Sequence, residues 1–148
     1  ASTITFDIRD MDRNIEIFSI NVNGKNKSLV DYVAGDTLKI EIKGHTQIKQ
    51  SLGIELKLKS EIGAPLAYYS PGHFEKLEET DIGAFTLEGE FKIKNIITGQ
   101  YVVDLYIISP GIAKLATLEN IFIINATGIS TTTGVSLSYN DVGFIKID

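Results

Sequence analysis

The feature that most constrains the fold of this chain is an alternation of apolar and polar residues with a period of two. In residues 99–109, Tyr101, Val103, Leu105 and Ile107 share one face, and the residues between them share the other. The same alternation runs through residues 14–24, 35–44, 53–60 and 84–95. Strands of this kind form antiparallel sheets with one buried and one wet face, and two such sheets pack into a β-sandwich. We therefore predict an all-β fold, an antiparallel β-sandwich.

The same pattern identifies the core and the turns. Asn23-Gly24 ends the segment at residues 14–24 and is a hairpin-turn signal. The predicted inward residues of the other three are Leu38, Ile40, Ile42, Ile54, Leu56, Leu58, Phe85, Leu87, Phe91 and Ile93. Residues 120–125 form a short apolar run that predicts a strand buried on both faces, and residues 134–141 and 143–148 are also strand-like. This gives eight or nine strands, with at most one short helix in residues 72–82, where Phe74, Leu77 and Glu78 have helical spacing.

Length and composition favour a single globular domain over residues 1–148. The chain has 148 residues, of which 43% are hydrophobic and 22% charged, enough for a sizeable core. No apolar run approaches the roughly 20 residues of a membrane span. Ala1 leads directly into a polar, strand-like segment, so we expect no signal peptide and a chain that is a piece of a longer protein.

Charge and cysteine content exclude several classes of function. The net charge of −5 disfavours nucleic acids and anionic membrane surfaces, which require clustered Lys and Arg. The absence of cysteine excludes disulfides, thiolate metal sites and a cysteine nucleophile.

The residues do not indicate an enzyme. His45 and His73 each lie next to a glycine in predicted loops, and no nucleophile motif accompanies them. The glycine-rich nucleotide-binding motifs are absent as well, so we expect no catalytic residues and no cofactor. Residues 7–12 and 78–81 could supply oxygen ligands to calcium, but neither has the required spacing, and solvated turns are the preferred interpretation.

A Gly, Ser and Thr-rich segment, residues 125–136, predicts a flexible hinge. The strand-like residues 135–148 follow it. A terminal strand on a loose hinge can exchange between protomers, although the residues alone slightly favour a long hairpin loop within one protomer.

Tyrosines supply the candidate ligand contacts. Sugar rings stack their C–H faces on aromatic rings, and their hydroxyls need hydrogen-bonding side chains beside those rings. Tyr68 and Tyr69 lie in a proline-flanked loop with His73 close behind, and Tyr139 lies beside Asn140-Asp141. The alternative is that a tyrosine ring pins the loop onto the core.

Three short motifs carry a resemblance to a known family over residues 15–125. They are a G-[DE]-x-[LV] strand opener, a GI-x-[LI]-[KR] strand and a late L-x-x-G-x-Y-x-[LV] strand. In this chain they correspond to Gly35-Asp36 with Leu38, Gly53-Ile54 with Leu56-Lys57, and Ile96 or Ile97 with Gly99 and Tyr101. The sequence thus resembles the C-terminal carbohydrate-binding domain of the ATPase subunit (Wzt type) of ABC transporters that export O-antigen polysaccharide.

The resemblance implies an immunoglobulin-like or jelly-roll sandwich, and a homodimer in which the last strand crosses to the partner. It implies recognition of the finished, often capped, non-reducing end of a lipid-linked glycan. The family location is cytoplasmic, beside the inner membrane, with an ATPase domain joining the binding domain to the membrane subunit. This chain lacks the ATPase domain, and its last strand lacks the tryptophan expected there.

The candidate site follows if residues 53–60 and 99–109 are neighbours in one sheet. Glu55, Lys57 and Lys59 would then lie near Asp104 and Tyr106 in a shallow groove on the wet face. Charged groups form strong hydrogen bonds to hydroxyl-rich ligands. The alternative is a solvated face with cross-strand Lys–Asp pairs, which we favour for Glu55 and Lys59. The predicted ligand-binding residues are Asp104, Tyr106, Lys57, Tyr68, Tyr69, His73 and Tyr139.

The sequence leaves two further functions open. One is a structural or adhesive sandwich whose terminal strand completes a neighbour's sheet. The other is an accessory domain of an esterase or glycosidase, which the missing catalytic residues disfavour.

Overall fold

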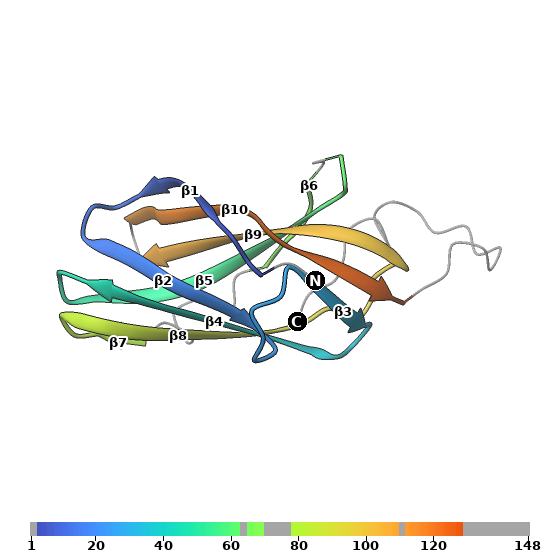
Figure 1. Cartoon of the computed structure of the whole chain (residues 1–148), viewed down its shortest axis with the longest axis horizontal. Coiled ribbons are helices and arrows are strands. Elements are labelled where there is room, and N and C mark those ends of the chain that lie inside the picture. The colour runs from blue at the N-terminus through green and yellow to red at the C-terminus, as the bar shows by residue number, and fades with distance from the viewer. Residues whose placement is uncertain (1–2, 63–64, 70–77, 110–111, 129–148) are drawn as a thin grey trace.

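The computed structural model describes residues 3–62, 65–69, 78–109 and 112–128. These residues form an all-β sandwich of two sheets, as predicted (Figure 1). Its strands are β1 (Asp7–Met11), β2 (Ile15–Val22), β3 (Leu29–Val33), β4 (Thr37–Thr46), β5 (Gln50–Lys59), β6 (Pro65–Tyr69), β7 (Glu78–Thr80), β8 (Gly83–Lys92), β9 (Gly99–Ser109) and β10 (Ile112–Thr127). The described residues contain no helix, and so none long enough to cross a membrane.

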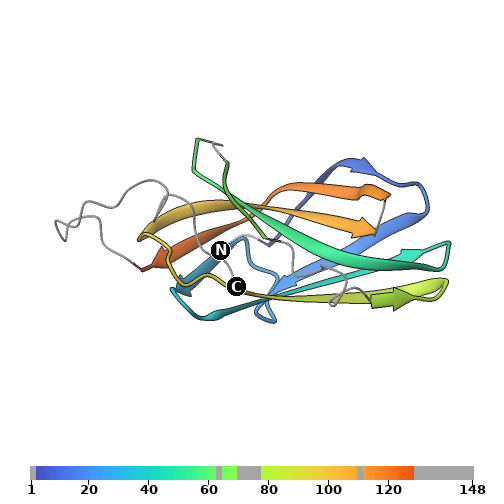
Figure 2. The ribbon, with the colours of Figure 1, turned by 180° about the vertical axis from the view of Figure 1, so that it is seen from behind.

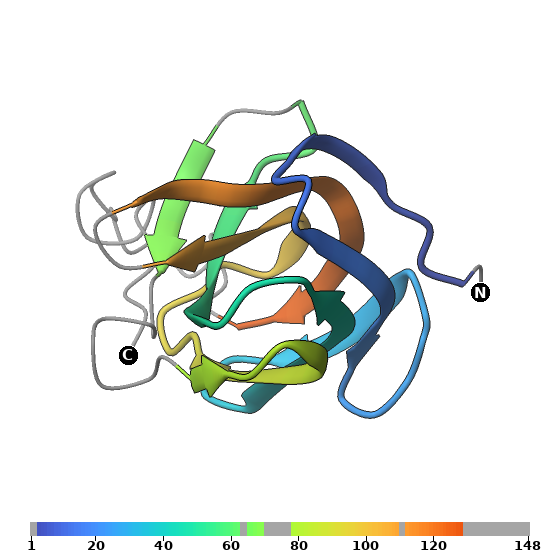
Figure 3. The ribbon, with the colours of Figure 1, turned by 90° about the vertical axis from the view of Figure 1, so that its left-hand side faces the viewer.

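The larger sheet has the strand order β1-β10-β9-β5-β6, with β3 also paired to β10 and β7 to β5. The smaller sheet has the order β2-β4-β8. Viewed nearly along the strands, the two sheets form two layers (Figure 3), and from behind β6 rises at the end of β5 (Figure 2). The β3–β10 pair is parallel, whereas the alternation predicted antiparallel pairing. The chain crosses to the larger sheet for β3 and returns for β4, so that crossing, not a hairpin, fixes the direction of β3.

The core lies between the sheets and consists of the predicted inward faces. Val103, Leu105 and Ile107 of β9 are fully buried, and Tyr101 is 9% exposed. All ten inward residues predicted for residues 35–44, 53–60 and 84–95 are buried as well. Each buried aliphatic side chain contributes on the order of 2 kcal/mol relative to exposure, so this alternation is the main determinant of the fold.

Two local features confirm the turn and strand-opening predictions. Asn23 and Gly24 have φ angles of 52° and 77°, the left-handed pair that a two-residue hairpin turn requires. The Tyr101 hydroxyl donates a 2.6 Å hydrogen bond to the carbonyl of Ile97, four residues upstream. This is the arrangement of a tyrosine corner in Greek-key sandwiches, and it ties the start of β9 to the segment that precedes it.

The run at residues 120–125 is not buried on both faces, so that prediction is wrong. Phe122 and Ile124 are buried, but Ile123 is 37% exposed. Only one face of β10 packs against the smaller sheet, and the other remains at the surface.

The predicted hinge begins too early. Residues 125–127 continue β10 and pair with β3, and residues 125 and 126 also pair with β9. Gly128 then donates a 2.9 Å hydrogen bond from its amide to Thr98 Oγ1. Pairing on both sides of the strand outweighs the flexible composition of these residues. The rest of the hinge and residues 135–148 lie outside the described residues.

Three segments predicted as loop or turn are strands. Residues 7–11 form β1, residues 78–80 form β7, and the strand β6 contains Tyr68 and Tyr69. Each of them pairs with a longer strand, β10 or β5. This pairing gives them strand conformation, although they are too short to show alternation. Glu78 therefore begins a strand and not part of a helix, and residues 70–77 lie outside the described residues.

Candidate functional site

The candidate site lies on the outer face of the larger sheet, where β5 and β9 are adjacent, as the site prediction required. Their antiparallel register pairs Lys57 with Asp104 and Glu55 with Tyr106. The register of β6 adds Tyr68 opposite Lys57. A single row across three neighbouring strands therefore contains Tyr68, Lys57 and Asp104.

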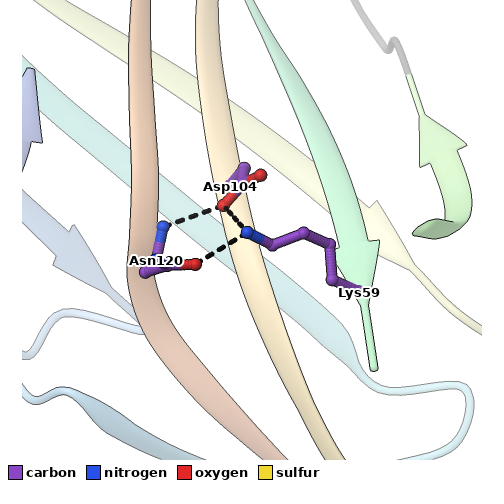
Figure 4. Close-up of polar contacts among 3 residues, drawn as sticks. All are labelled: Lys59, Asp104 and Asn120. Atoms are coloured by element: carbon purple, nitrogen blue, oxygen red, sulfur yellow. Dashed lines mark hydrogen bonds and ion pairs between the residues drawn. The ribbon is translucent and has the colours of Figure 1, made fainter. Parts of the chain in front are cut away.

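Asp104 belongs to a three-residue polar network (Figure 4). Its Oδ1 lies 2.9 Å from Lys59 Nζ and accepts a 2.8 Å hydrogen bond from the backbone amide of Asn120. Lys59 Nζ also donates a 2.7 Å hydrogen bond to Asn120 Oδ1. The network joins three strands, since Lys59 is on β5, Asp104 on β9 and Asn120 on β10.

The network coincides with a bulge in β10. The β9–β10 register shifts between Leu118 and Phe122, and Asn120 within this interval has a φ of 53°. Asparagine tolerates this left-handed conformation better than most residues. The irregular backbone removes the amide of Asn120 from regular strand pairing, and the Asp104 carboxylate accepts its hydrogen bond instead. The carboxylate therefore holds the bulge against β9.

Asp104 does not line an open surface, contrary to the prediction that placed it in a groove on the wet face. Asp104 is 2% exposed, and the Lys59 side chain is 13% exposed. A buried carboxylate requires a paired cation and hydrogen bonds, which Lys59 and Asn120 supply. The cross-strand Lys–Asp alternative was correct in kind. The pair is diagonal, because Lys59 lies opposite Val102, and it is mostly buried where a solvated pair was expected.

Tyr106 is also covered, with 5% of its surface exposed. Lys114 Nζ of β10 lies 3.8 Å from the centroid of its ring. This cation–π contact occupies one face of the ring. A sugar could stack on that face only after Lys114 moved away.

The structure places the remaining predicted residues as follows. Lys57 is half-buried beside Asp104, and the backbone of Tyr69 pairs with that of Leu56. His73 and Tyr139 lie outside the described residues. His45 is in β4 and not in a loop, because its neighbours continue the pairing with β2 and β8.

Metal ligands do not gather anywhere in the described part of the chain. No group of three His, Asp or Glu side chains there could hold an ion. The acidic residues of the two candidate segments lie in or next to the paired strands β1 and β7, which do not form ligand-binding loops.

Sequence reasoning missed Asn120. Its signal was a lone Glu-Asn pair interrupting the apolar pattern of a strand. A residue that tolerates left-handed backbone in such a position is typical of a bulge.

No protein-family model and no curated protein matches this sequence. Among solved structures, the C-terminal domain of wzt aligns with 90% of this chain and 89% of its own, with a TM-score of 0.63 and 10% identity. A Niemann-Pick type C2 protein from the Japanese carpenter ant aligns with 83% of this chain and 99% of its own, with a TM-score of 0.58 and 7% identity. The chain therefore shares its β-sandwich fold with both.

Proposed function

We propose that this chain is a non-catalytic carbohydrate-binding module that recognises the end of an O-antigen polysaccharide and selects it for export by an ABC transporter. The observation that carries the proposal is the fold likeness to the C-terminal domain of wzt, which extends over nearly all of both chains. The motifs at Gly35, Gly53 and Gly99 support it independently.

The ligand surface proposed here is the outer face of the larger sheet around Lys57 and Tyr68. These two residues lie side by side in the backbone register, and Tyr69, His73 and Tyr139 remain predicted contacts. Asp104 and Tyr106 lie next to this surface but are already in contact with other side chains. Asp104 is bonded to Lys59 and Asn120, and the ring of Tyr106 contacts Lys114. Direct contact with a sugar would require those partners to move.

Isothermal calorimetry tests the function directly. The titrant is O-polysaccharide released from the lipopolysaccharide of the organism that encodes this chain. Saturable binding is expected, and it should weaken several-fold in Lys57→Ala and Tyr68→Ala. A polysaccharide that gives no binding at millimolar sugar concentration would contradict the proposal.

The proposal includes a location and partners. We infer a homodimer made by exchange of residues 135–148, in the cytoplasm beside the inner membrane, joined through an ATPase domain to a membrane subunit. Light scattering should give twice the chain mass. Truncation after Gly128 should give a monomer.

A structural or adhesive module is the second candidate, and one observation favours it. The strand β3 is paired to β10 along one edge and has Leu29 and Val33 44% and 54% exposed. Among the described strands β3 has no partner on its other side, and an apolar edge strand can accept a strand from a neighbour. Concentration-dependent growth into oligomers larger than a dimer, without glycan binding, would support this candidate over the first.

A further inference from the structure

A groove on the other side of the sandwich surrounds the one described phenylalanine that is strongly exposed. Phe18 of β2 has 60% of its surface exposed. The groove beside it has a volume of about 270 Å³ and is lined by Arg13, Asn14, Glu16, Phe18, His45 and Gln47, together with Ile15. This is close to the roughly 300 Å³ at which ligand pockets begin, which limits the occupant to about one ring.

A bulge places Phe18 in this groove. In the β2–β4 register Ile17 pairs with Gly44 and Ser19 with Lys43, so Phe18 has no residue opposite. Bulges re-aim side chains and are common beside functional sites. Gly44 makes the bulge possible, because a Cβ there would lie 2.1 Å from the carbonyl oxygen of Glu16. The exposed ring is thus a built feature of the strand.

Polar side chains line the groove together with Phe18. Glu16 and His45 lie opposite each other in the register, at the end of the sheet next to Arg13 and Gln47. Among the described residues, no hydrogen bond or ion pair engages the side chains of these four. A carboxylate, a guanidinium, an imidazole and an amide therefore remain available to a ligand.

Together these observations define a ligand of one chemical class. An exposed ring provides a platform for an apolar face, and charged donors and acceptors around it match a ring of hydroxyl groups. A pyranose has both properties. We propose that the Phe18 groove binds one pyranose residue of a glycan, as a second contact separate from the surface around Lys57. This inference rests on the proposed function.

The test is calorimetric titration of the same O-polysaccharide into the full chain and three variants. Phe18→Ala should weaken binding about tenfold, and Phe18→Tyr, which keeps the ring, should stay within about twofold of the wild type. Ile62→Ala is the matched control, because Ile62 is 92% exposed and lies in the turn between β5 and β6. It should bind as the wild type does.

The outcomes separate this inference from the proposed function. If the wild type binds and Phe18→Ala binds equally well, the groove is not a site, although the proposed function stands. If the wild type does not bind, the proposed function fails and the inference fails with it. Circular dichroism and the dispersion of amide NMR signals establish that Phe18→Ala is folded. If that variant is unfolded, Phe18 is a structural residue and the inference is overturned.

Discussion

The polar groups on the two outer faces of the sandwich differ in whether other side chains bind them. On the larger sheet, Asp104 is buried, Lys59 is mostly buried, and the two are bonded to each other and to Asn120. On the smaller sheet, Glu16 and His45 lie beside an exposed ring without such partners among the described residues. A charged residue in an aliphatic strand can therefore serve to join neighbouring strands. An exposed aromatic ring beside polar groups that have no internal partners indicates a surface for binding.

The largest expected effect comes from Asp104→Ala. Removal of the carboxylate leaves Lys59 charged and nearly buried, and leaves the amide of Asn120 without its acceptor. The free energy of unfolding should fall by about 3 kcal/mol, measured by urea denaturation. Asp31→Ala is the control, because Asp31 is exposed, and it should change the value by less than about 0.5 kcal/mol. Equal effects of the two variants would show that the network does not stabilise the larger sheet.

Substitutions of Asn120 separate the backbone conformation of the bulge from its side-chain bond. Asn120→Ala loses the acceptor for Lys59 and replaces a residue that tolerates the left-handed φ of 53° with one that tolerates it less well, so we expect a loss of about 2 kcal/mol. Asn120→Gly loses only the acceptor and should cost about 1 kcal/mol. Urea denaturation of both variants provides the comparison. A glycine variant less stable than the alanine variant would contradict the assigned role of the bulge.

Tyr101→Phe tests a hydrogen bond at the start of β9, apart from the polar groups of either outer face. Loss of the hydrogen bond to Ile97 should cost about 1 kcal/mol near neutral pH. Burial raises the pKa of the Tyr101 phenol above its ordinary value of 10.0. The folded state therefore retains the phenol proton at a pH where the unfolded state loses it. This contribution is fully present below about pH 10 and is lost as the pH rises through the raised pKa.

The corresponding measurement is urea denaturation of the wild type and Tyr101→Phe between pH 8 and pH 11. The difference in stability between the two should shrink as the pH rises above about 10. The phenylalanine variant should still lose some stability, since burial also raises the pKa of Tyr32. A difference that grows with pH would contradict the assignment.

The smallest effect on stability is expected for Phe18→Ala. Phe18 is 60% exposed, so its truncation should change the free energy of unfolding by less than about 0.5 kcal/mol. Thermal and urea denaturation measure it. A loss above about 2 kcal/mol would assign the ring to the core and remove the contrast between the two faces.

The sequence predicts the long strands and not the short ones. Alternation in residues 99–109 extends over enough positions to identify both the strand and its core face. The short strands β1, β3, β6 and β7 have at most five residues each, too few to show a period. Their pairing depends on which longer strand lies beside them, and that is information about the tertiary structure.

The site was less predictable because alternation does not report how deeply an outer face is covered. Asp104 and Tyr106 were placed on the correct face, but their burial depends on Lys59, Asn120 and Lys114, which come from two other strands. The bulge at Phe18 did leave a signal. Apolar residues shift from odd positions, at Ile15 and Ile17, to even positions, at Ile20 and Val22, and one extra residue in the strand accounts for that change.

An NMR titration of the ¹⁵N-labelled chain with fragments of the O-polysaccharide tests the central claim most directly. We predict saturable shifts of the amide signals of Glu16, Phe18 and His45, and of residues around Lys57. The hydrogen-bonded amide of Asn120 should change little. Saturable binding that shifts the amide of Asn120 most and leaves that of Phe18 unchanged would contradict the assignment of the two faces. The absence of any saturable shift would contradict glycan binding itself.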